Sequence, residues 1–476
     1  MFRNKVERNV IIAVILVTII VFTYWFLHNP VKSFTVNVPG QDHRPAKDTS
    51  SQSAVVIGEK FKEYTTVTSA LTGKWTRFRG ADFDNINKEN IRLIDHFGKE
   101  GPKIRWKVEL GDGHAAPVIF NGKVYVLDYD ERKKNDALRC FALETGTELW
   151  RRWYSVNLKR NHGMSRTIPA ITEKYIVTIG PKCHVMCCNP QNGDFLWGID
   201  LGKDYNTEVP LWYTGQCPLI DNDIAVIAPG GSSLLIGVDC ATGKVLWKTP
   251  NPDKWKMSHS SVMPMILGGK KMFVYNAIGG LCGISAEGTD VGKMLWKTSV
   301  FNPSVIAPSP LYLGDNKIFM TAGYGAGSAI FQVINQGGSF AVNVLKNYKP
   351  KDGLASEQQT PILYDHHLFG ILPKDAAEKR NQFVCCTTDD TQKILWTSST
   401  SDRYGLGPYL LADGKFFILN DEGTLTIARE STSKFIFLDK AKIMDGQDAW
   451  GPMAMTDGML LLRDSKQMVC IDVRKQ

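Results

Sequence analysis

Hydrophobic and polar positions divide the chain into three stretches. Val10 to Leu27 is an uncharged apolar run, close to the ~20 residues that an α-helix needs to cross a bilayer. Ser33 to Gly73 is rich in polar residues and shows no sustained apolar period. From Lys74 to Gln476 the apolar residues recur in short alternating runs separated by turns, as in a succession of β-strands. The pattern predicts a membrane helix, a polar tether and a β-rich domain.

The β-rich part repeats a short motif, Ala241-Thr242-Gly243-Lys244-Val245-Leu246-Trp247. Most copies lie roughly 50 residues apart, a period typical of repeat architectures. The Gly allows the positive φ of a tight turn, and one large aromatic residue per unit suits packing between neighbouring sheets. We predict this structural role for the repeat tryptophans, which are Trp106, Trp150, Trp197, Trp247, Trp296 and Trp396.

Each unit also carries a proline just before an apolar strand, where its missing N–H does no harm. These prolines are Pro117, Pro169, Pro218, Pro264, Pro310, Pro361, Pro408 and Pro452. Four short strands per unit predict an all-β fold, an eight-bladed β-propeller of four-stranded antiparallel blades, with an open superhelix as the alternative. We expect Ile104–Val108 to supply the last blade's missing fourth strand and close the ring. Fourth strands without Trp are expected at Phe340–Tyr348 and Lys434–Leu438.

The chain therefore divides into residues 1–9, a cytoplasmic stub; 10–27, a transmembrane signal anchor; 28–73, a flexible tether; and 74–476, the propeller. Arg3, Lys5 and Arg8 precede the apolar run. The positive-inside rule then predicts a single pass through the inner membrane, with the propeller on the periplasmic, extracytoplasmic side. A cleaved signal peptide is the alternative. The net charge of +8 is mild for 476 residues and dispersed, which argues against a nucleic-acid partner.

The repeat motif and the segment Trp75-Thr76-Arg77-Phe78-Arg79-Gly80 resemble the PQQ-repeat family of eight-bladed propellers, and the resemblance extends from Trp75 to the C-terminus. It implies one of two kinds of protein. Quinoprotein alcohol dehydrogenases hold pyrroloquinoline quinone and Ca²⁺ in the funnel at one end of the ring. The propeller subunit of the outer-membrane β-barrel assembly machinery binds no quinone and acts as a scaffold. A shared fold does not decide between them.

The loops that lead into the innermost strands of a propeller converge on its axis at one end. Here they combine His, Arg and Glu with several Trp and Tyr, which suits a bound small molecule, a glycan or a loop of another protein. Ordinary exposed loops are the alternative. The ligand-binding candidates for this funnel are His114, His162, Arg166, Glu208, Trp212, Tyr213, Trp255, His259, Glu357, Gln358, Arg403, Tyr404, Asp448 and Trp450.

Adjacent cysteines occur twice among ten, as Cys187-Cys188 and Cys385-Cys386. In the quinoprotein dehydrogenases that the chain resembles, such a pair forms a disulfide against the quinone. Here both pairs fall in predicted third strands, so we expect buried packing instead. A metal site formed by Cys183 with Cys187 and Cys188 is disfavoured, because strand alternation sends Cys188 to the opposite face.

Known catalytic, phosphate-binding and calcium-loop motifs are absent from the sequence, so catalytic residues stay unassigned and no metal or cofactor is expected. We expect a membrane-anchored binding or scaffold module of the cell envelope, with an envelope protein or glycan as partner. One alternative is a pyrroloquinoline-quinone-dependent dehydrogenase of alcohols or sugars. It would use Glu208, Gln358 and Asp448 toward Ca²⁺, with Glu208 or Asp448 as an alternative base and Arg166 or Arg403 near the quinone. A glycan-binding propeller would instead stack sugars on Trp212, Tyr213, Trp255 and Trp450.

Overall fold

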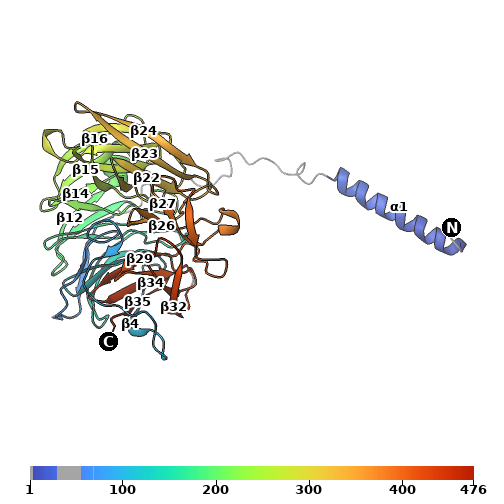
Figure 1. The fold of residues 1–476 in the computed structure, drawn as a ribbon, viewed down its shortest axis with the longest axis horizontal. Helices are drawn as coiled ribbons and strands as arrows, with labels where there is room; N and C mark the ends of the chain where they lie inside the picture. Colours follow the sequence, from blue (N-terminus) through green and yellow to red (C-terminus); the bar gives the residue numbers. More distant parts are fainter. Residues whose placement is uncertain (1–3, 29–54, 68, 447, 476) are drawn as a thin grey trace. The chain divides into compact units, whose positions relative to one another are not determined.

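The computed structural model describes residues 4–28, 55–67, 69–446 and 448–475, which fall into two compact units (Figure 1). The first unit contributes one helix, α1 (Lys5–Leu27). After a charged first turn its side chains are almost all apolar and none is buried, and the helix is long and apolar enough to cross a membrane. This agrees with the predicted anchor, although a signal sequence near the N-terminus has the same properties. Most of the predicted tether, residues 29–54, lies outside the described residues.

The second unit, Val55–Gln476, is an eight-bladed β-propeller, which confirms the predicted fold. Blades 1 and 2 consist of β5 (Val118–Phe120), β6 (Lys123–Asp130), β7 (Asn135–Ala142) and β8 (Glu148–Ser155), then β9 (Ala170–Ile171), β10 (Ile176–Ile179), β11 (His184–Cys188) and β12 (Phe195–Asp200). Blades 3 and 4 consist of β13 (Leu219–Asp221), β14 (Ile224–Ile227), β15 (Ser233–Asp239) and β16 (Val245–Pro250), then β17 (Met263–Leu267), β18 (Lys270–Ala277), β19 (Gly280–Ser285) and β20 (Met294–Thr298).

Blades 5 and 6 consist of β21 (Leu311–Gly314), β22 (Lys317–Ala322), β23 (Gly327–Gln336) and β24 (Ser339–Tyr348), then β25 (Ile362–Tyr364), β26 (His367–Ile371), β27 (Phe383–Thr387) and β28 (Ile394–Thr397). Blades 7 and 8 consist of β29 (Tyr409–Ala412), β30 (Lys415–Leu419), β31 (Thr424–Arg429) and β32 (Ile436–Lys442), then β33 (Ala454–Thr456), β34 (Met459–Arg463), β35 (Gln467–Asp472) and β4 (Lys103–Glu109). Short helices lie at α2 (Leu201–Tyr205), Gly288–Asp290 and Ala377–Lys379.

Ring closure follows the prediction. Strand β4, from the start of the domain, pairs antiparallel with β35 at its end, with Trp106 opposite Cys470 (Figure 1). The last blade therefore has four strands like the others, and its third strand, β35, is paired on both sides. The predicted strand at Phe340–Tyr348 is also observed, as β24, whereas the one predicted at Lys434–Leu438 lies a few residues later, as β32.

Four of the repeat tryptophans pack one blade against the glycine turn of the next blade. The Trp197 ring in blade 2 lies against the Thr-Gly turn of blade 3, where a Cβ on Gly243 would come within 2.7 Å of it. Gly243 also has a φ of 73°, so its place in the motif has both a steric and a conformational reason. The Trp197 indole N–H donates to the Cys240 carbonyl at 2.8 Å. Trp106 makes the same kind of contact between blades 8 and 1, with Gly146 and the Leu143 carbonyl.

The second compact unit starts at Val55, before the position near Lys74 where the sequence pattern places the start of the propeller. Strand β1 (Lys60–Glu63) pairs antiparallel with β8 along the outside of blade 1, and the side chains of Ile57 and Leu71 pack on the core. A polar strand that is exposed on its outer side carries no alternating apolar signal. Its sequence therefore resembles a linker.

The segment Trp75–Gly80 begins a crossing of the ring centre. Strand β2 (Lys74–Trp75) pairs with the innermost strand of blade 1, and β3 (Ile86–Asn87) pairs with that of blade 7. Between them, Arg79 is buried and donates to the carbonyls of Thr360 at 2.6 Å and Pro361 at 2.9 Å, both at the start of blade 6. This segment ties together blades that are far apart in the sequence and closes the centre of the ring.

All ten cysteines are free thiols and buried. Cys187 packs with Cys183 and Trp197, whereas Cys188 belongs to the cluster on the other face of the blade. The predicted split between the faces is therefore confirmed. Burial raises the pKa of the Cys188 and Cys385 thiols to about 12, which keeps both protonated at neutral pH.

Candidate functional site

A narrow funnel lies at the end of the ring where the predicted loops meet. It has an open volume of about 100 Å³. Among the predicted candidates, the structure brings seven together in its lining: His114, Arg166, Trp212, His259, Glu357, Gln358 and Trp450. They come from the loops that enter blades 1, 2, 3, 4, 6 and 8, so the expected convergence of these loops is observed.

Two lining residues come from places that the sequence analysis did not consider. Tyr324 lies in the loop between β22 and β23, the second and third strands of blade 5. In a meandering blade this loop lies at the same end as the loop entering the first strand, and that connectivity was the available signal. Phe78 belongs to the segment that crosses the ring centre. No local pattern in the sequence places it there.

Aromatic rings occupy much of the funnel. Trp212 stacks with His259 at a centroid distance of 6.3 Å and with Tyr324 at 5.8 Å. A second stack joins His114 and Trp450 at 4.8 Å. Such offset pairs are favourable contacts in their own right. The aromatic residues of the funnel therefore already pack on one another.

The backbone around Trp212 is strained and held in place by side chains. Trp212 and Tyr213 have φ angles of 63° and 71°, a left-handed conformation that costs non-glycine residues about 1–3 kcal/mol each. The Arg166 Nε donates to the Trp212 carbonyl at 2.6 Å, and the Tyr213 hydroxyl donates to the Lys159 carbonyl at 2.5 Å. These bonds keep the Trp212 ring in the funnel.

The titratable groups of the funnel are shifted mainly by burial. Burial, followed by the charges of Arg166 and Arg463, lowers the pKa of His114 to about 3. Burial and Arg166 lower the pKa of His259 to about 4. Both imidazoles are therefore neutral at pH 7. Burial also lowers the pKa of Arg166 to about 10, which leaves this guanidinium charged.

Glu357 is the buried carboxylate of the funnel. Its Oε1 lies 3.8 Å from the Lys374 ammonium, while its Oε2 has no hydrogen-bond partner among the described residues. Burial raises the pKa of this carboxyl group. Lys374 also lies 5.2 Å from the centre of the Tyr324 ring, so the Glu357 side of the funnel has its own cation.

Other polar groups in these loops connect the blades. The backbone N–H of Cys217 donates to the Ser261 hydroxyl, that of Ser261 to the Ser309 hydroxyl, and that of Ser309 to the Thr360 hydroxyl, all at 2.9–3.0 Å. This belt joins blades 3 to 6 around the axis. Some of the polar residues in the loops that predict a binding funnel therefore connect neighbouring blades.

The remaining seven candidates lie outside the funnel lining. Glu208 is exposed and pairs with Lys256 at 2.7 Å. Trp255 is buried in blade 4 against Gly279, and Tyr404 is buried between blades 6 and 7. The other four are His162, Tyr213, Arg403 and Asp448. The His162 carbonyl accepts from His114, and the Tyr213 contact is described above. Arg403 donates to carbonyls of the 377–380 turn, and Asp448 lies in the loop that leads into blade 8.

The funnel does not fit the quinone and calcium ion. Its volume of about 100 Å³ lies below the ~300 Å³ at the lower end of small-molecule sites. The adjacent cysteines are in the sheets, away from the funnel. Glu208 is directed to Lys256, so the predicted calcium ligands are not brought together. Within the described ranges, no group of three or more His, Cys, Asp or Glu is arranged to hold a metal ion.

Comparisons with known proteins agree with this fold. A PQQ-repeat family model described as "Outer membrane protein assembly factor BamB" matches residues 96–212 and 133–370, which together span more than half of the chain. No curated protein sequence matches this chain. Among solved structures, BamB from Moraxella catarrhalis has a TM-score of 0.52 at 12% identity, covering 78% of this chain and 99% of that one.

Two further structures have similar scores. A europium-containing methanol dehydrogenase has a TM-score of 0.50 at 12% identity, covering 84% of this chain and 89% of that one. The computationally designed Ika8 protein also has a TM-score of 0.50, at 13% identity, covering 78% of this chain and 100% of that one. At these identities the likeness concerns the fold alone.

Proposed function

Because the chain belongs to the PQQ-repeat propeller family whose model is described as outer membrane protein assembly factor BamB, we propose that it is a membrane-anchored scaffold protein of the cell envelope. Helix α1 would hold it in the inner membrane, with the propeller on the periplasmic side. The mouth of the funnel would bind a segment of a partner protein. This scaffold role was the first hypothesis from the sequence.

The apolar rim of the funnel carries the proposal. Leu211 is 62% exposed and Val209 42% exposed, and both lie in the same loop as Trp212. Tyr324, which also lines the funnel, is 51% exposed and stacks on Trp212. Exposed apolar groups gathered around a polar depression are typical of protein-binding surfaces. The funnel interior is largely filled, so its rim offers more area for contact than its depth.

The strain at Trp212 and Tyr213 supports the same surface. Left-handed non-glycine residues persist where the surrounding structure fixes them, and they cluster at functional sites. Here the strained pair directly follows Leu211, whose side chain projects into solvent. A loop that is held open in this way presents Leu211 before a partner arrives, which reduces the entropy lost on binding.

Site-specific photocrosslinking tests the rim. A photoreactive residue at Leu211 in the full-length chain, irradiated in the native cell, is expected to give a discrete crosslinked product with one envelope protein. The matched control is position Leu246, which is 48% exposed on the outer strand of blade 3. Introducing Trp212→Ala into the Leu211 probe is expected to reduce the product, because the ring beside it is lost. Equal labelling at both positions would contradict the proposal.

The orientation has its own test. Since all ten native cysteines are buried, an added surface cysteine, Leu211→Cys, is expected to be the main site of maleimide labelling. A membrane-impermeant maleimide should label this variant in intact spheroplasts if the propeller lies outside the inner membrane. Labelling only after lysis would place the propeller in the cytoplasm and contradict that part of the proposal.

A further inference from the structure

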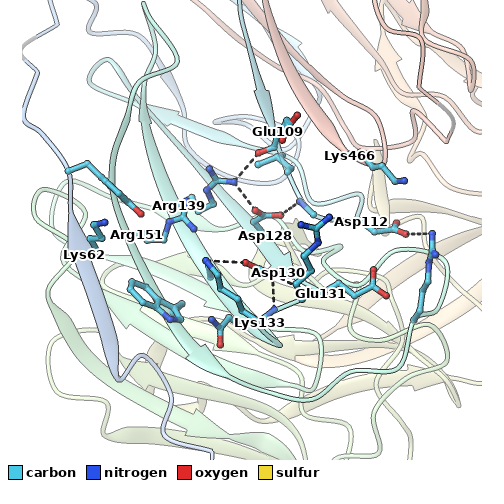
Figure 2. Close-up of a pocket in the computed structure, with 18 residues that line it drawn as sticks. Lys62, Glu109, Asp112, Asp128, Asp130, Glu131, Lys133, Arg139, Arg151 and Lys466 are labelled. Atoms are coloured by element: carbon cyan, nitrogen blue, oxygen red, sulfur yellow. Dashed lines mark hydrogen bonds and ion pairs between the residues drawn. The ribbon is translucent and has the colours of Figure 1, made fainter.

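A second and larger cavity lies toward the outside of blade 1 and shares no lining residue with the funnel. Its volume is about 670 Å³, within the range of roughly 300–1,000 Å³ that is usual for small-molecule sites. One wall is formed by β1, β8 and β7, and the others by the loops at residues 109–112 and 130–135 and by Lys466. Figure 2 shows the charged side chains that surround it.

Three cations form a row across one wall. In the strand register Lys62 lies directly opposite Arg151, and Arg151 lies directly opposite Arg139. Directly opposed like charges destabilise a sheet. Such a row is therefore unfavourable wherever no carboxylate offsets it.

Carboxylates neutralise only the inner part of this row. Glu148 accepts from Arg139 at 2.8 Å and from Arg151 at 2.6 Å, and Asp128 accepts from Arg139 at 2.8 Å (Figure 2 shows the pair with Asp128). Within the described part of the chain, no carboxylate lies within ion-pair distance of Lys62. The Lys62 ammonium instead lies 4.6 Å from the centre of the Tyr64 ring. The outer end of the row thus keeps a positive charge available to a ligand.

Blade 1 gains this wall from an added strand. Among the described strands, only β1 extends a blade on its outer edge, and it brings Lys62 and Tyr64 to the cavity. Ordering such a segment costs about 1–2 kcal/mol per residue in backbone entropy. At this cost in entropy, the strand completes the cavity with a segment that lies outside the repeats.

The facing loop supplies acceptors and the wall supplies a ring. Asp130, Glu131 and Asn135 line the cavity with side-chain oxygens, and within the described residues Glu131 has no ion-pair partner. Trp153 contributes an indole to the same lining. Carboxylate and amide oxygens accept hydrogen bonds from hydroxyl groups, and an indole face packs against the C–H face of a sugar ring.

From these features we propose that the cavity binds an acidic saccharide. A carboxylate or phosphate on the sugar would pair with Lys62 and Arg151, and ring hydroxyls would donate to Asp130, Glu131 and Asn135. Trp153 would pack against one sugar ring. The site is separate from the funnel rim, so it can exist whether or not the scaffold proposal holds.

Titration calorimetry on the full-length protein in detergent micelles tests the site. The probes are tetragalacturonate, the neutral maltotetraose and inorganic phosphate. We expect saturable binding of tetragalacturonate that weakens as salt is raised, because charge pairing contributes to it. Maltotetraose and phosphate are each expected to bind at least about tenfold more weakly, because the first lacks charge and the second lacks the hydroxyls and ring.

Variants locate the binding to this cavity. Lys62→Glu is expected to weaken tetragalacturonate binding about tenfold or more, the effect of losing one charge-assisted hydrogen bond. Lys248→Glu is the matched control, since Lys248 is also an exposed lysine near a tyrosine ring on a blade's outer strand, and it should bind like the parent. Trp153→Leu should weaken binding and remove any ligand-induced change in tryptophan fluorescence.

Four results would overturn the inference. The first is no binding of tetragalacturonate at 10 mM, a concentration about tenfold above a weak dissociation constant of ~1 mM. The second and third are binding of maltotetraose or of phosphate as tight as that of tetragalacturonate. The fourth is equal affinity in Lys62→Glu and the parent. Thermal unfolding of both lysine variants checks that the fold is intact, so a loss of binding cannot be confused with unfolding.

Discussion

The funnel on the axis and the cavity of blade 1 differ in what fills them. The funnel has about 100 Å³ of open volume and contains stacked aromatic and imidazole rings, whereas the blade 1 cavity has about 670 Å³ and is lined largely by charged side chains. Eight innermost strands meet at the axis and crowd it, while the outer strands of neighbouring blades diverge. The point of convergence is thus largely occupied by the groups that hold the ring together. Open space is found toward the outside of the blades.

The largest effect is expected in the segment that crosses the ring centre. Arg79→Met removes the donors that hold the carbonyls of Thr360 and Pro361 and should lower the free energy of unfolding by about 3 kcal/mol or more. Denaturant unfolding measures it. The control is Arg92→Met, whose side chain is 85% exposed beside Asp413 and should change stability by less than ~0.5 kcal/mol. Similar losses of stability in the two variants would contradict a special structural role for Arg79 in the segment that crosses the ring centre.

Acid should destabilise the funnel next most strongly. His114 and His259 have folded pKa values of about 3 and about 4, below the usual value near 6.5. Between the folded and the usual pKa, the unfolded chain binds more protons than the folded protein. The free energy of unfolding is therefore highest above pH 6.5 and falls as pH drops toward 4. Each histidine should contribute a loss of about 2–3 kcal/mol. His259→Phe should therefore reduce the slope of unfolding free energy between pH 6.5 and 4, and an unchanged slope would mean that His259 titrates normally.

A much smaller effect, of opposite sign, is expected in the blade 1 cavity. Lys62→Gln removes one of three opposed cations, so the free energy of unfolding should stay the same or rise by up to ~0.5 kcal/mol. Denaturant unfolding at low salt, with Lys248→Gln as the control, measures this change. A loss above 1 kcal/mol (the scale of a buried interaction) would show that Lys62 serves folding, and the contrast with the funnel would disappear.

No effect is expected from the cofactor of the related dehydrogenases. Pyrroloquinoline quinone with Ca²⁺ should leave the thermal midpoint of the full-length protein unchanged, because a ligand raises it only by binding the folded state. A saturable rise would show that the folded protein binds the quinone. It would favour the quinone-dependent dehydrogenase over the scaffold.

Local patterns in the sequence were enough to predict most of the fold. The apolar run of α1, the Gly and Trp of each repeat and the proline before each first strand are signals carried by neighbouring residues. Ring closure by β4 could also be predicted, because a fourth strand was left over at one end and missing at the other. Repetition made the proline visible eight times and the tryptophan six times.

Tertiary structure alone decided which polar residues share a site. Trp212 and Trp255 lie in similar loops, yet one enters the funnel and the other is buried in its own blade, because the path of each loop depends on contacts with neighbouring blades. Strand β1 pairs with residues about 90 positions further along the chain, and nothing in its own composition specifies that partner. The sequence by itself thus determined the blades, their number and their closure. Packing between distant segments determined the filled funnel and the open, charged cavity of blade 1.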